Sequence, residues 1–253
     1  MSFKLQNFLK NDDVRVLEQK GMFTVFEYIR DLSCTPSEAP LKYYMSEMNV
    51  RRKQICIKLE NDGAILQPGK MQWMLGNIQQ TTGLKGAGDA VGKFFSAKVT
   101  GENMIKPEYR GNGLVVTEPT YKYYLIENLS DWKGEMVIDD GLFCACDNEV
   151  RLKTVARSNL SSAIAGGEGL FNLCLCGYGN VVLESRVPRE ELITIQLEND
   201  VLKVDGNYAI AWSNSLDFTV ERSGKTLLGS AASGEGLVNV YRGTGKVLLM
   251  PQV

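Results

Sequence analysis

Three glutamates recur at a nearly constant spacing, and they are the first candidates for chemistry. Each follows a glycine, and a Gly-x-Gly sequence begins eight or nine residues after the glutamate. Glu102, Glu168 and Glu235 are 66 and 67 residues apart. If three copies of one unit surround a pseudo-threefold axis, these carboxylates would converge and bind a hard cation such as Ca²⁺ or Mg²⁺, or shift one another's pKa. The preferred interpretation is that each lies on an exposed hairpin turn and accepts backbone N–H bonds.

Four of the six cysteines form two Cys-x-Cys pairs, Cys144 with Cys146 and Cys174 with Cys176. Alternate residues of a strand project from the same face, so the two pairs could offer four thiolates to zinc. Zinc-binding pairs are usually spaced Cys-x2-4-Cys, however, and free cysteine is among the most buried residue types. We therefore interpret the pairs as buried strand residues. All six thiols are expected to be reduced, because the sequence shows no secretion signal.

Histidine is absent from the chain. Its absence excludes Ser-His-Asp and Cys-His nucleophile systems, histidine-containing zinc sites and the two-histidine iron triad. The glycine-rich segments are not phosphate loops, because residues 166–169 precede a predicted strand and residues 83–88 lack the Gly-Lys-Ser/Thr ending. We expect a protein that is not an enzyme, with no catalytic residue and no cofactor.

The charge is nearly balanced, with 28 basic and 30 acidic residues and a net charge of −2. A dedicated nucleic-acid-binding protein usually has a basic excess that displaces counterions from phosphates. One local stretch nevertheless combines aromatic side chains that could stack on RNA bases with interleaved lysines. Its residues are Tyr121, Lys122, Tyr123, Tyr124, Trp132 and Lys133. An ordinary half-buried strand shows the same alternation.

The first residues lack the apolar core of a signal peptide. No stretch approaches the 18 or more uncharged apolar residues of a membrane-spanning helix. The sequence therefore predicts a cytoplasmic protein of a bacterium-like cell, without membrane insertion.

The elements that must position these residues are predicted to be strands. Short runs rich in Val, Ile, Leu, Tyr and Phe recur every 8–12 residues and are separated by Gly, Asn, Asp and Ser. The one predicted helix is Gly88–Lys98, and Gly177-Tyr178-Gly179 and Gly243-Thr244-Gly245 are predicted turns. Predicted strands cover residues 14–19, 22–30, 54–60, 71–75, 114–118, 122–127, 135–138, 142–146, 151–156, 170–176, 180–185, 192–197, 201–204, 208–211, 216–220, 237–241 and 246–250.

A second motif repeats in step with the glutamates. Leu59-Glu60-Asn61-Asp62, Ile126-Glu127-Asn128-Leu129 and Leu197-Glu198-Asn199-Asp200 each precede a glycine, namely Gly69, Gly141 and Gly206. Copies of one unit must pack together to close a core. We therefore predict a single globular domain, residues 1–253. Residues 1–50 would supply an N-terminal strand pair and a connector, and residues 51–253 three β repeats of about 66 residues.

Several of these segments resemble a known family. The sequence LSSAIAGGEGLF at 160–171, followed by Gly177-Tyr178-Gly179 and Asn180–Leu183, is similar to the signature of the "altered inheritance of mitochondria" family. This family consists mostly of bacterial proteins of unknown function. Residues 234–238 with 243–247 resemble its ending, and 69–71 with 76–78 its N-terminal element, so the resemblance spans roughly residues 54–250. The first copy departs from the pattern, with Asn103 where the others have glycine.

The resemblance implies a fold similar to the tryptophan RNA-binding attenuation protein. That fold is a shortened double-stranded β-helix, here triplicated with pseudo-threefold symmetry and minimal helix. It implies no catalytic residues. We expect a non-catalytic binding or scaffold protein that acts as a homo-oligomer with a protein partner not identifiable from sequence. The alternatives are RNA binding, by fold analogy, and a small-molecule sensor or enzyme built in a β-barrel-like interior.

Overall fold

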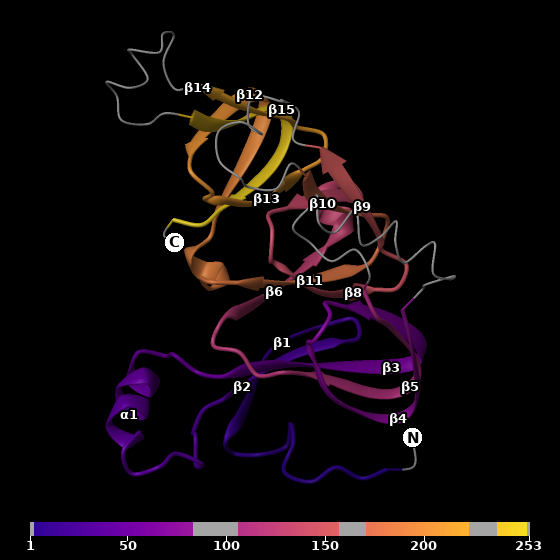
Figure 1. Cartoon of the computed structure of the whole chain (residues 1–253), viewed down its shortest axis with the longest axis vertical. Helices are drawn as coiled ribbons and strands as arrows, with labels where there is room; N and C mark the ends of the chain where they lie inside the picture. Colours follow the sequence, from indigo (N-terminus) through magenta and orange to yellow (C-terminus); the bar gives the residue numbers. More distant parts are fainter. Residues whose placement is uncertain (1–2, 83–105, 157–170, 223–236, 252–253) are drawn as a thin grey trace.

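Two curled antiparallel sheets follow one another along the long axis of the molecule (Figure 1). The computed structural model describes residues 3–82, 106–156, 171–222 and 237–251. Within these residues it has one α-helix, α1 (Ala39–Glu47), and two 3₁₀ turns, η1 (Leu129–Trp132) and η2 (Arg189–Glu191). The strands are β1 Val14–Lys20, β2 Phe23–Tyr28, β3 Lys53–Leu66, β4 Met71–Thr81, β5 Glu108–Thr117, β6 Tyr123–Asn128, β7 Glu135–Ile138, β8 Phe143–Asp147, β9 Arg151–Ala156, β10 Phe171–Cys176, β11 Asn180–Ser185, β12 Ile193–Asp205, β13 Ala209–Ser213, β14 Asp217–Arg222 and β15 Leu237–Leu249.

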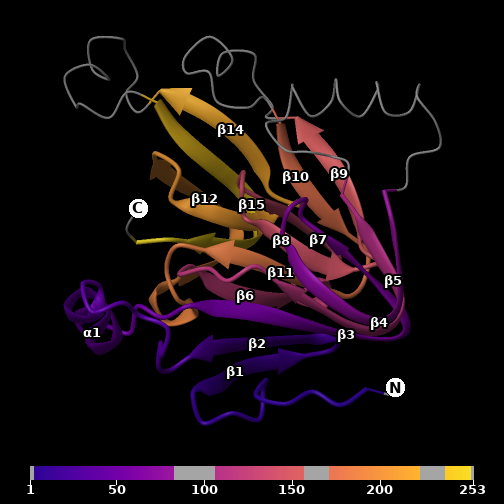
Figure 2. The ribbon, with the colours of Figure 1, turned by 60° about the horizontal axis from the view of Figure 1, so that its bottom comes forward.

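The first sheet has the order β1-β2-β3-β8-β11-β6, and β5 joins it by pairing with both β3 and β4. The second has the order β12-β15-β13-β7-β10-β9, with β14 also paired to β15. Figure 2 shows β1, β2 and β3 at one side of the molecule, with β12, β14 and β15 on the other side of β6 and β11. The N-terminal strand pair β1–β2 adds to the outer edge of β3, where Phe23 lies opposite Ile57.

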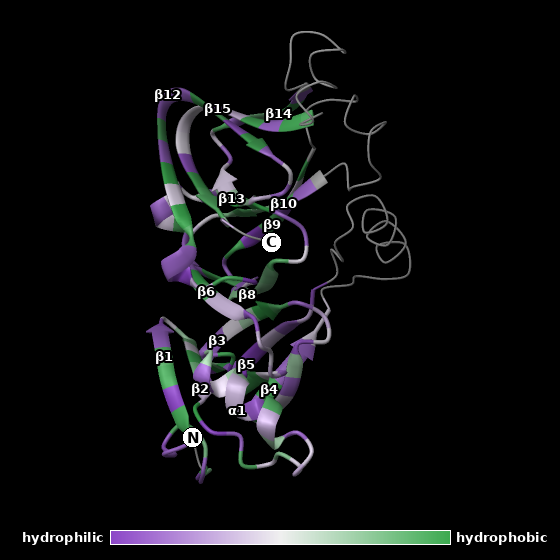
Figure 3. Ribbon diagram, turned by 90° about the vertical axis from the view of Figure 1, so that its left-hand side faces the viewer, coloured by the Kyte–Doolittle hydropathy of each residue, from purple (hydrophilic) through white to green (hydrophobic). Residues whose placement is uncertain are grey.

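The core fills the space between and inside these sheets because apolar residues alternate along the strands. Hydrophobic and hydrophilic residues alternate along β12, for example (Figure 3). The largest buried cluster takes side chains from both sheets, including Leu125 and Leu183 of the first and Met136 and Leu175 of the second. A shared cluster ties the two sheets together, since neither sheet can bury its inner face alone.

The all-β class predicted from the sequence is confirmed, whereas some predicted turns are wrong. Gly243-Thr244-Gly245 does not separate two strands but lies inside the continuous strand β15, and the segments predicted at 192–197 and 201–204 form the single strand β12. Opposite Gly243, the register of β12 shifts between Leu197 and Asp200, so the strand pair bends without ending. A bulge provides the change of direction for which the sequence suggests a turn.

The same bend occurs in the β3–β5 pair. The register shifts between Glu60 and Asp62, opposite Gly111. Asn61 takes φ 56° and donates its backbone N–H to Asn112 Oδ1 at 2.9 Å. Asn199 of β12, with φ 53°, donates in the same way to Thr244 Oγ1 at 2.9 Å. The middle residue of Gly-x-Gly therefore supplies the side-chain acceptor that holds each bend.

A helix, α1, occurs within the segment that the sequence analysis assigns to a connector. Helix α1 has Pro40 in its first turn, a position where the missing N–H costs no helical bond. Before it, Glu38 accepts hydrogen bonds from the backbone and the hydroxyl of Thr35, at 3.0 and 2.8 Å. The predicted helix Gly88–Lys98 lies outside the described residues. The triplication, the pseudo-threefold axis and the domain limits remain predictions.

Candidate functional site

Glu102, Glu168 and Glu235, the candidates for a cation site, all lie outside the described residues. Within the described ranges, no group of three or more cysteine, aspartate or glutamate side chains has an arrangement suited to a metal ion. The convergence of the three glutamates therefore stays a prediction.

Cys144 and Cys146 project from opposite faces of β8, contrary to the expectation that they share one. Val182 of β11 lies opposite Ala145 and Leu183 opposite Phe143, so Cys144 is the extra residue of a β-bulge. A bulge interrupts the alternation of faces. Cys146 consequently packs in the cluster between the sheets, and Cys144 in the core of the first sheet.

Cys174 and Cys176 lie on β10 in the second sheet and share a third cluster. Their sulfurs are 3.4 Å apart, and both side chains are buried. The two Cys-x-Cys pairs therefore do not meet, and their positions are those of core residues. Burial raises the pKa of Cys144 to about 12 and that of Cys56 to about 11. A thiol with a raised pKa in apolar surroundings is a poor nucleophile and a poor metal ligand.

Native thiol labelling is expected to modify one cysteine per chain. Cys34 is the one partly exposed thiol, since the other five cysteines are buried. Incubation with an alkylating reagent at neutral pH, read by intact mass, should add one label to the native protein and six after unfolding. Rapid labelling of two or more sites in the native protein would contradict this burial, and Cys34→Ser is the control that should remove the native label.

The aromatic residues proposed for RNA stacking do not form one exposed platform. Trp132 is only 2% exposed, and its Nε1 donates to Glu127 Oε2 at 2.9 Å. Tyr124 is also buried, whereas Tyr121 is exposed and Tyr123 packs under the Lys53 ammonium at 4.2 Å. Buried rings cannot stack on bases. RNA binding through this stretch would therefore have to use Tyr121 and the lysines.

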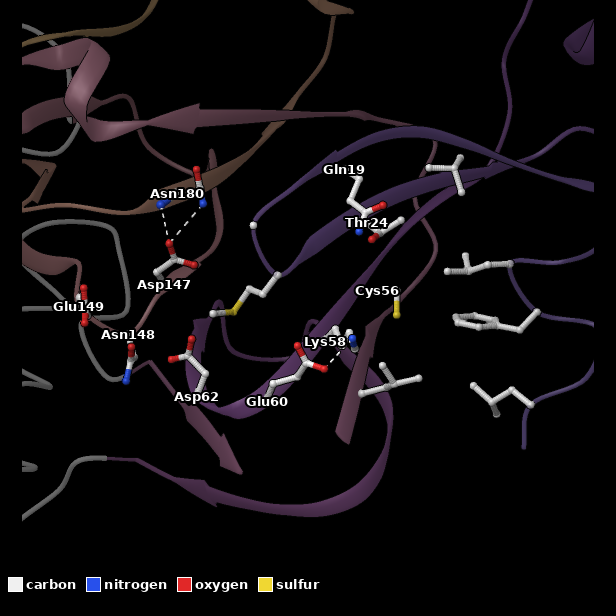
Figure 4. Close-up of a pocket in the computed structure, with 17 residues that line it drawn as sticks. Gln19, Thr24, Cys56, Lys58, Glu60, Asp62, Asp147, Asn148, Glu149 and Asn180 are labelled. Atoms are coloured by element: carbon white, nitrogen blue, oxygen red, sulfur yellow. Dashed lines mark hydrogen bonds and ion pairs between the residues drawn. The ribbon is translucent and has the colours of Figure 1, made fainter. Parts of the chain in front are cut away.

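A cleft with a volume of about 830 Å³ lies between the N-terminal segment, β3 and the end of β8 (Figure 4). Four carboxylates line it, against one lysine, Lys58, whose ammonium is 2.6 Å from Glu60. Figure 4 shows Asn180 pointing at Asp147, which accepts its backbone N–H at 2.7 Å. The carboxylates are Glu60, Asp62, Asp147 and Glu149.

This cleft is acidic. Burial, followed by the negative charges of Asp62 and Glu149, raises the pKa of Asp147, although the backbone N–H of Asn180 opposes the shift. Like charges that raise one another's pKa disfavour a phosphate ligand and favour a cationic one. The cleft is thus unsuited to an RNA backbone.

Helix α1 forms an exposed apolar surface beside the first sheet (Figure 1). None of its residues is buried, and Leu41, Tyr43 and Tyr44 are each more than 60% exposed. Its position is fixed by Asp31, which accepts from Lys42 of the helix at 2.8 Å and from Arg52 at 2.9 Å. Exposed apolar side chains on an anchored element are typical of a protein-contact surface.

Two long strands have one unpaired edge each. Among the described strands, β4 pairs only with β5, and β12 only with β15. They contain 11 and 13 residues, whereas the other edge strands contain six or seven. Met74 on β4 is 42% exposed and Val201 on β12 is 47% exposed. Such edges offer a row of backbone donors and acceptors to another strand.

The open edge of β4 has a signal in its sequence that the repeat motifs do not include. Proteins usually protect a free edge with charged residues or proline. Residues 71–81 contain neither. A strand of this length without such protection indicates that another segment or another molecule covers its edge.

Comparison with known proteins gives a family and a fold. Residues 47–252 match the family described as mitochondrial biogenesis AIM24. An uncharacterized protein of Streptococcus pyogenes serotype M6 is 28% identical over 201 residues, which are 76% of this chain and 79% of that protein. The crystal structure of a Streptococcus pyogenes structural-genomics target has a TM-score of 0.59 at 23% identity, covering 94% of each chain. Within the described residues, no helix is long and apolar enough to cross a membrane.

Proposed function

Because the chain belongs to the mitochondrial biogenesis AIM24 family, we propose that it is a non-catalytic binding or scaffold protein that works as an oligomer. The family match confirms the resemblance drawn from the sequence. The similarity to the tryptophan RNA-binding attenuation protein remains a prediction. Neither the family description nor its relatives assign a reaction, so the proposal depends on the surface of the molecule.

The observation that carries the proposal is the pair of long edges on β4 and β12 with which no other described strand pairs. Strand addition to a free edge is a common means of protein association, since the main chain supplies the hydrogen bonds. The exposed apolar helix α1 offers a further contact surface. A protein built to associate would expose such features.

We propose the cytoplasm as the location of this assembly. Cys174 and Cys176 are unpaired although their sulfurs are 3.4 Å apart, and none of the six cysteines forms a disulfide. Thiols remain reduced in the cytosol, whereas secreted proteins commonly oxidise them. The buried, weakly acidic thiols also support a structural role.

Measuring the mass of the untagged protein tests this function. Native mass spectrometry and light scattering should give a multiple of 28.1 kDa that persists on dilution to low micromolar concentration. A mass of 28.1 kDa at every concentration, with no protein co-purifying from the native cells, would sink the proposal. Repeating the measurement at high salt separates sheet pairing, which should persist, from charge-driven association.

RNA binding remains the alternative. The same preparation can be titrated with single-stranded RNA at low and high salt. Phosphate contacts would make the affinity fall steeply with salt. We expect no binding at micromolar concentration, because the net charge is −2 and the cleft is acidic.

A further inference from the structure

We propose that β4 of a second copy of this chain pairs with the free edge of β12. The same kind of strand pairing, here called a junction, occurs twice within each chain. This inference rests on the proposed oligomeric function and adds its partner, its strands and its register. Each strand of the two internal junctions has a counterpart at one of the two free edges.

The first internal junction joins the end of β3 to β8. Ala64, Ile65 and Leu66 lie opposite Asp147, Cys146 and Ala145, respectively. Just beyond, the Gln67 N–H donates to the carbonyl of the bulge residue Cys144 at 2.8 Å. At the other end, the Asn148 N–H donates to the Gly63 carbonyl at 3.2 Å.

The second internal junction joins β7 to β13 with the same pattern. Met136, Val137 and Ile138 lie opposite Ser213, Trp212 and Ala211. Register slips at Ile210, the bulge residue of β13, whose carbonyl accepts the Asp139 N–H at 3.0 Å. The Asn214 N–H donates to the Glu135 carbonyl at 3.3 Å. Two junctions between different pairs of strands thus use the same three-residue ladder and the same bond to a bulge.

The end of β12 resembles the end of β3, which is the strand that pairs with β8 in the first junction. Asp62 of β3 lies opposite Gly111 beside the bend, and Asp200 of β12 lies opposite Gly243 beside the equivalent bend. Counting onward from these aspartates, three residues of β12 take the places of Ala64, Ile65 and Leu66. They are Leu202, Lys203 and Val204.

The start of β4 resembles β8 and β13, the strands of the two junctions that contain a bulge. Its register on β5 slips between Met71 and Trp73, so Gln72 is a bulge residue like Cys144 and Ile210. The residues after the bulge take the places of Ala145, Cys146 and Asp147. They are Trp73, Met74 and Leu75.

The exposure of these residues differs between the internal junctions and the ends. Ile65 and Asp147 are partly buried, and the other ladder residues of the two internal junctions are buried. At the free ends, only Val204 is buried, whereas Lys203 and Met74 are exposed. Ladder residues are therefore mostly buried in the internal junctions, whereas the equivalent residues of β4 and β12, which have no neighbouring strand, are mostly partly or fully exposed.

The two free edges lie at opposite ends of the long axis (Figures 1 and 3). Two copies therefore join end to end, with Val204 opposite Trp73, Lys203 opposite Met74 and Leu202 opposite Leu75 of the second copy. By analogy with Gln67 and Asp139, the Asp205 N–H donates to the Gln72 carbonyl. Such a heterologous contact leaves a free edge at each end, so further copies can add to form a closed ring or an open filament.

Disulfide trapping between two variants tests the register. Met74→Cys and Lys203→Cys are prepared separately in a Cys34→Ser background, which removes the partly exposed thiol. Directly opposed residues of an antiparallel pair have Cα atoms about 5.5 Å apart, within reach of a disulfide. Mixing the two variants under mild oxidation should give a covalent dimer, and each variant alone should give none. The matched control is Val201→Cys, exposed like Lys203 but two residues out of register, where the disulfide should be largely lost.

Removing a backbone donor tests the edge without any new thiol. The Gln67 N–H points at β8, and donors alternate sides along a strand, so Lys203, which occupies the place of Ile65, should donate to the free side. Lys203→Pro should therefore reduce the native mass to 28.1 kDa with an unchanged far-UV circular dichroism spectrum. Lys203→Ala should keep the oligomer.

The outcomes separate this inference from the proposed function. An oligomer whose Met74→Cys and Lys203→Cys variants give no mixed disulfide, or in which one variant alone gives a covalent dimer, would overturn the β4–β12 pairing and leave the oligomeric function standing. A monomer at all concentrations would overturn both. If Lys203→Pro fails to fold, the trapping experiment still decides.

Discussion

Replacing Gly113 by alanine is expected to lower the free energy of unfolding by about 3 kcal/mol, at the upper end of overpacking effects. Gly113 lies opposite Gly76 where β4 and β5 approach closely. A Cβ there would overlap the carbonyl oxygen of Leu75 and lie 2.7 Å from Ile78 Cδ1. Because the first obstacle is backbone of a paired strand, the two strands must separate to make room.

Gly69→Ala is the matched control. Gly69 has φ +79°, which strains an alanine, but a Cβ there would meet nothing within 4 Å. The expected cost is about 1 kcal/mol, from backbone strain alone. The comparison separates close approach of strands from the conformational freedom that glycine provides.

Urea unfolding followed by far-UV circular dichroism measures both variants. A loss for Gly113→Ala no larger than that for Gly69→Ala would contradict the prediction, because it would mean that β4 and β5 leave room for a Cβ between them. The expected larger loss for Gly113→Ala also explains the Gly-x-Gly repeat in physical terms. The repeat marks a crowded bend in a strand pair.

Trp132→Ala is expected to cost about 3–5 kcal/mol, the range for removing a buried aromatic side chain. The indole of Trp132 is one of the largest fully buried side chains and packs in the cluster between the two sheets. The Lys246 ammonium lies 3.9 Å from the centre of its ring. Truncation would leave a cavity and remove the donor to Glu127, a buried carboxylate that would keep its 2.7 Å bond to Arg189.

Trp132→Phe distinguishes packing from hydrogen bonding. Phenylalanine fills much of the space but cannot donate, so the expected cost is about 1–3 kcal/mol, that of an unsatisfied buried acceptor. Circular dichroism is the appropriate readout, because both variants remove a fluorophore. A Trp132→Ala protein as stable as the parent would mean that the ring is exposed and again available to stack on a base.

The bends of the long strands show why some turns were predicted wrongly. Local sequence indicates that Gly243 and Asn199 depart from regular strand geometry, and they do, with φ +114° and +53°. Whether such a departure ends a strand or only bends it depends on pairing. In β15 the ladder to β12 resumes on both sides of Gly243, so the strand continues.

The faces of the cysteines depend on pairing in the same way. Alternation places Cys144 and Cys146 on one face, and nothing in the residues themselves predicts the bulge at Cys144. The bulge exists because β8 pairs with β11, whose register slips there. The aromatic stretch was equally ambiguous, because a strand with alternating tyrosines can be half-buried or exposed. The sheets decided that Trp132 and Tyr124 are buried.

The sequence by itself determined the class of structure and the family. The short spacing of apolar runs predicted strands, and the repeated glycine motifs carried the family resemblance that the family match confirmed. The absence of histidine excluded the catalytic and metal systems that need it. These conclusions follow from residue types and local spacing, which are properties of the chain alone.

Only the tertiary structure decided which side chains share a core and which edges stay open. Those properties depend on contacts between residues far apart in the sequence, such as Leu66 with Ala145 and Ile138 with Ala211. Local sequence does not say which strands lie side by side, and the same side chains are buried when a neighbouring strand is present and exposed when it is missing. The free sides of β4 and β12 are therefore visible only once every other described strand has found its partner.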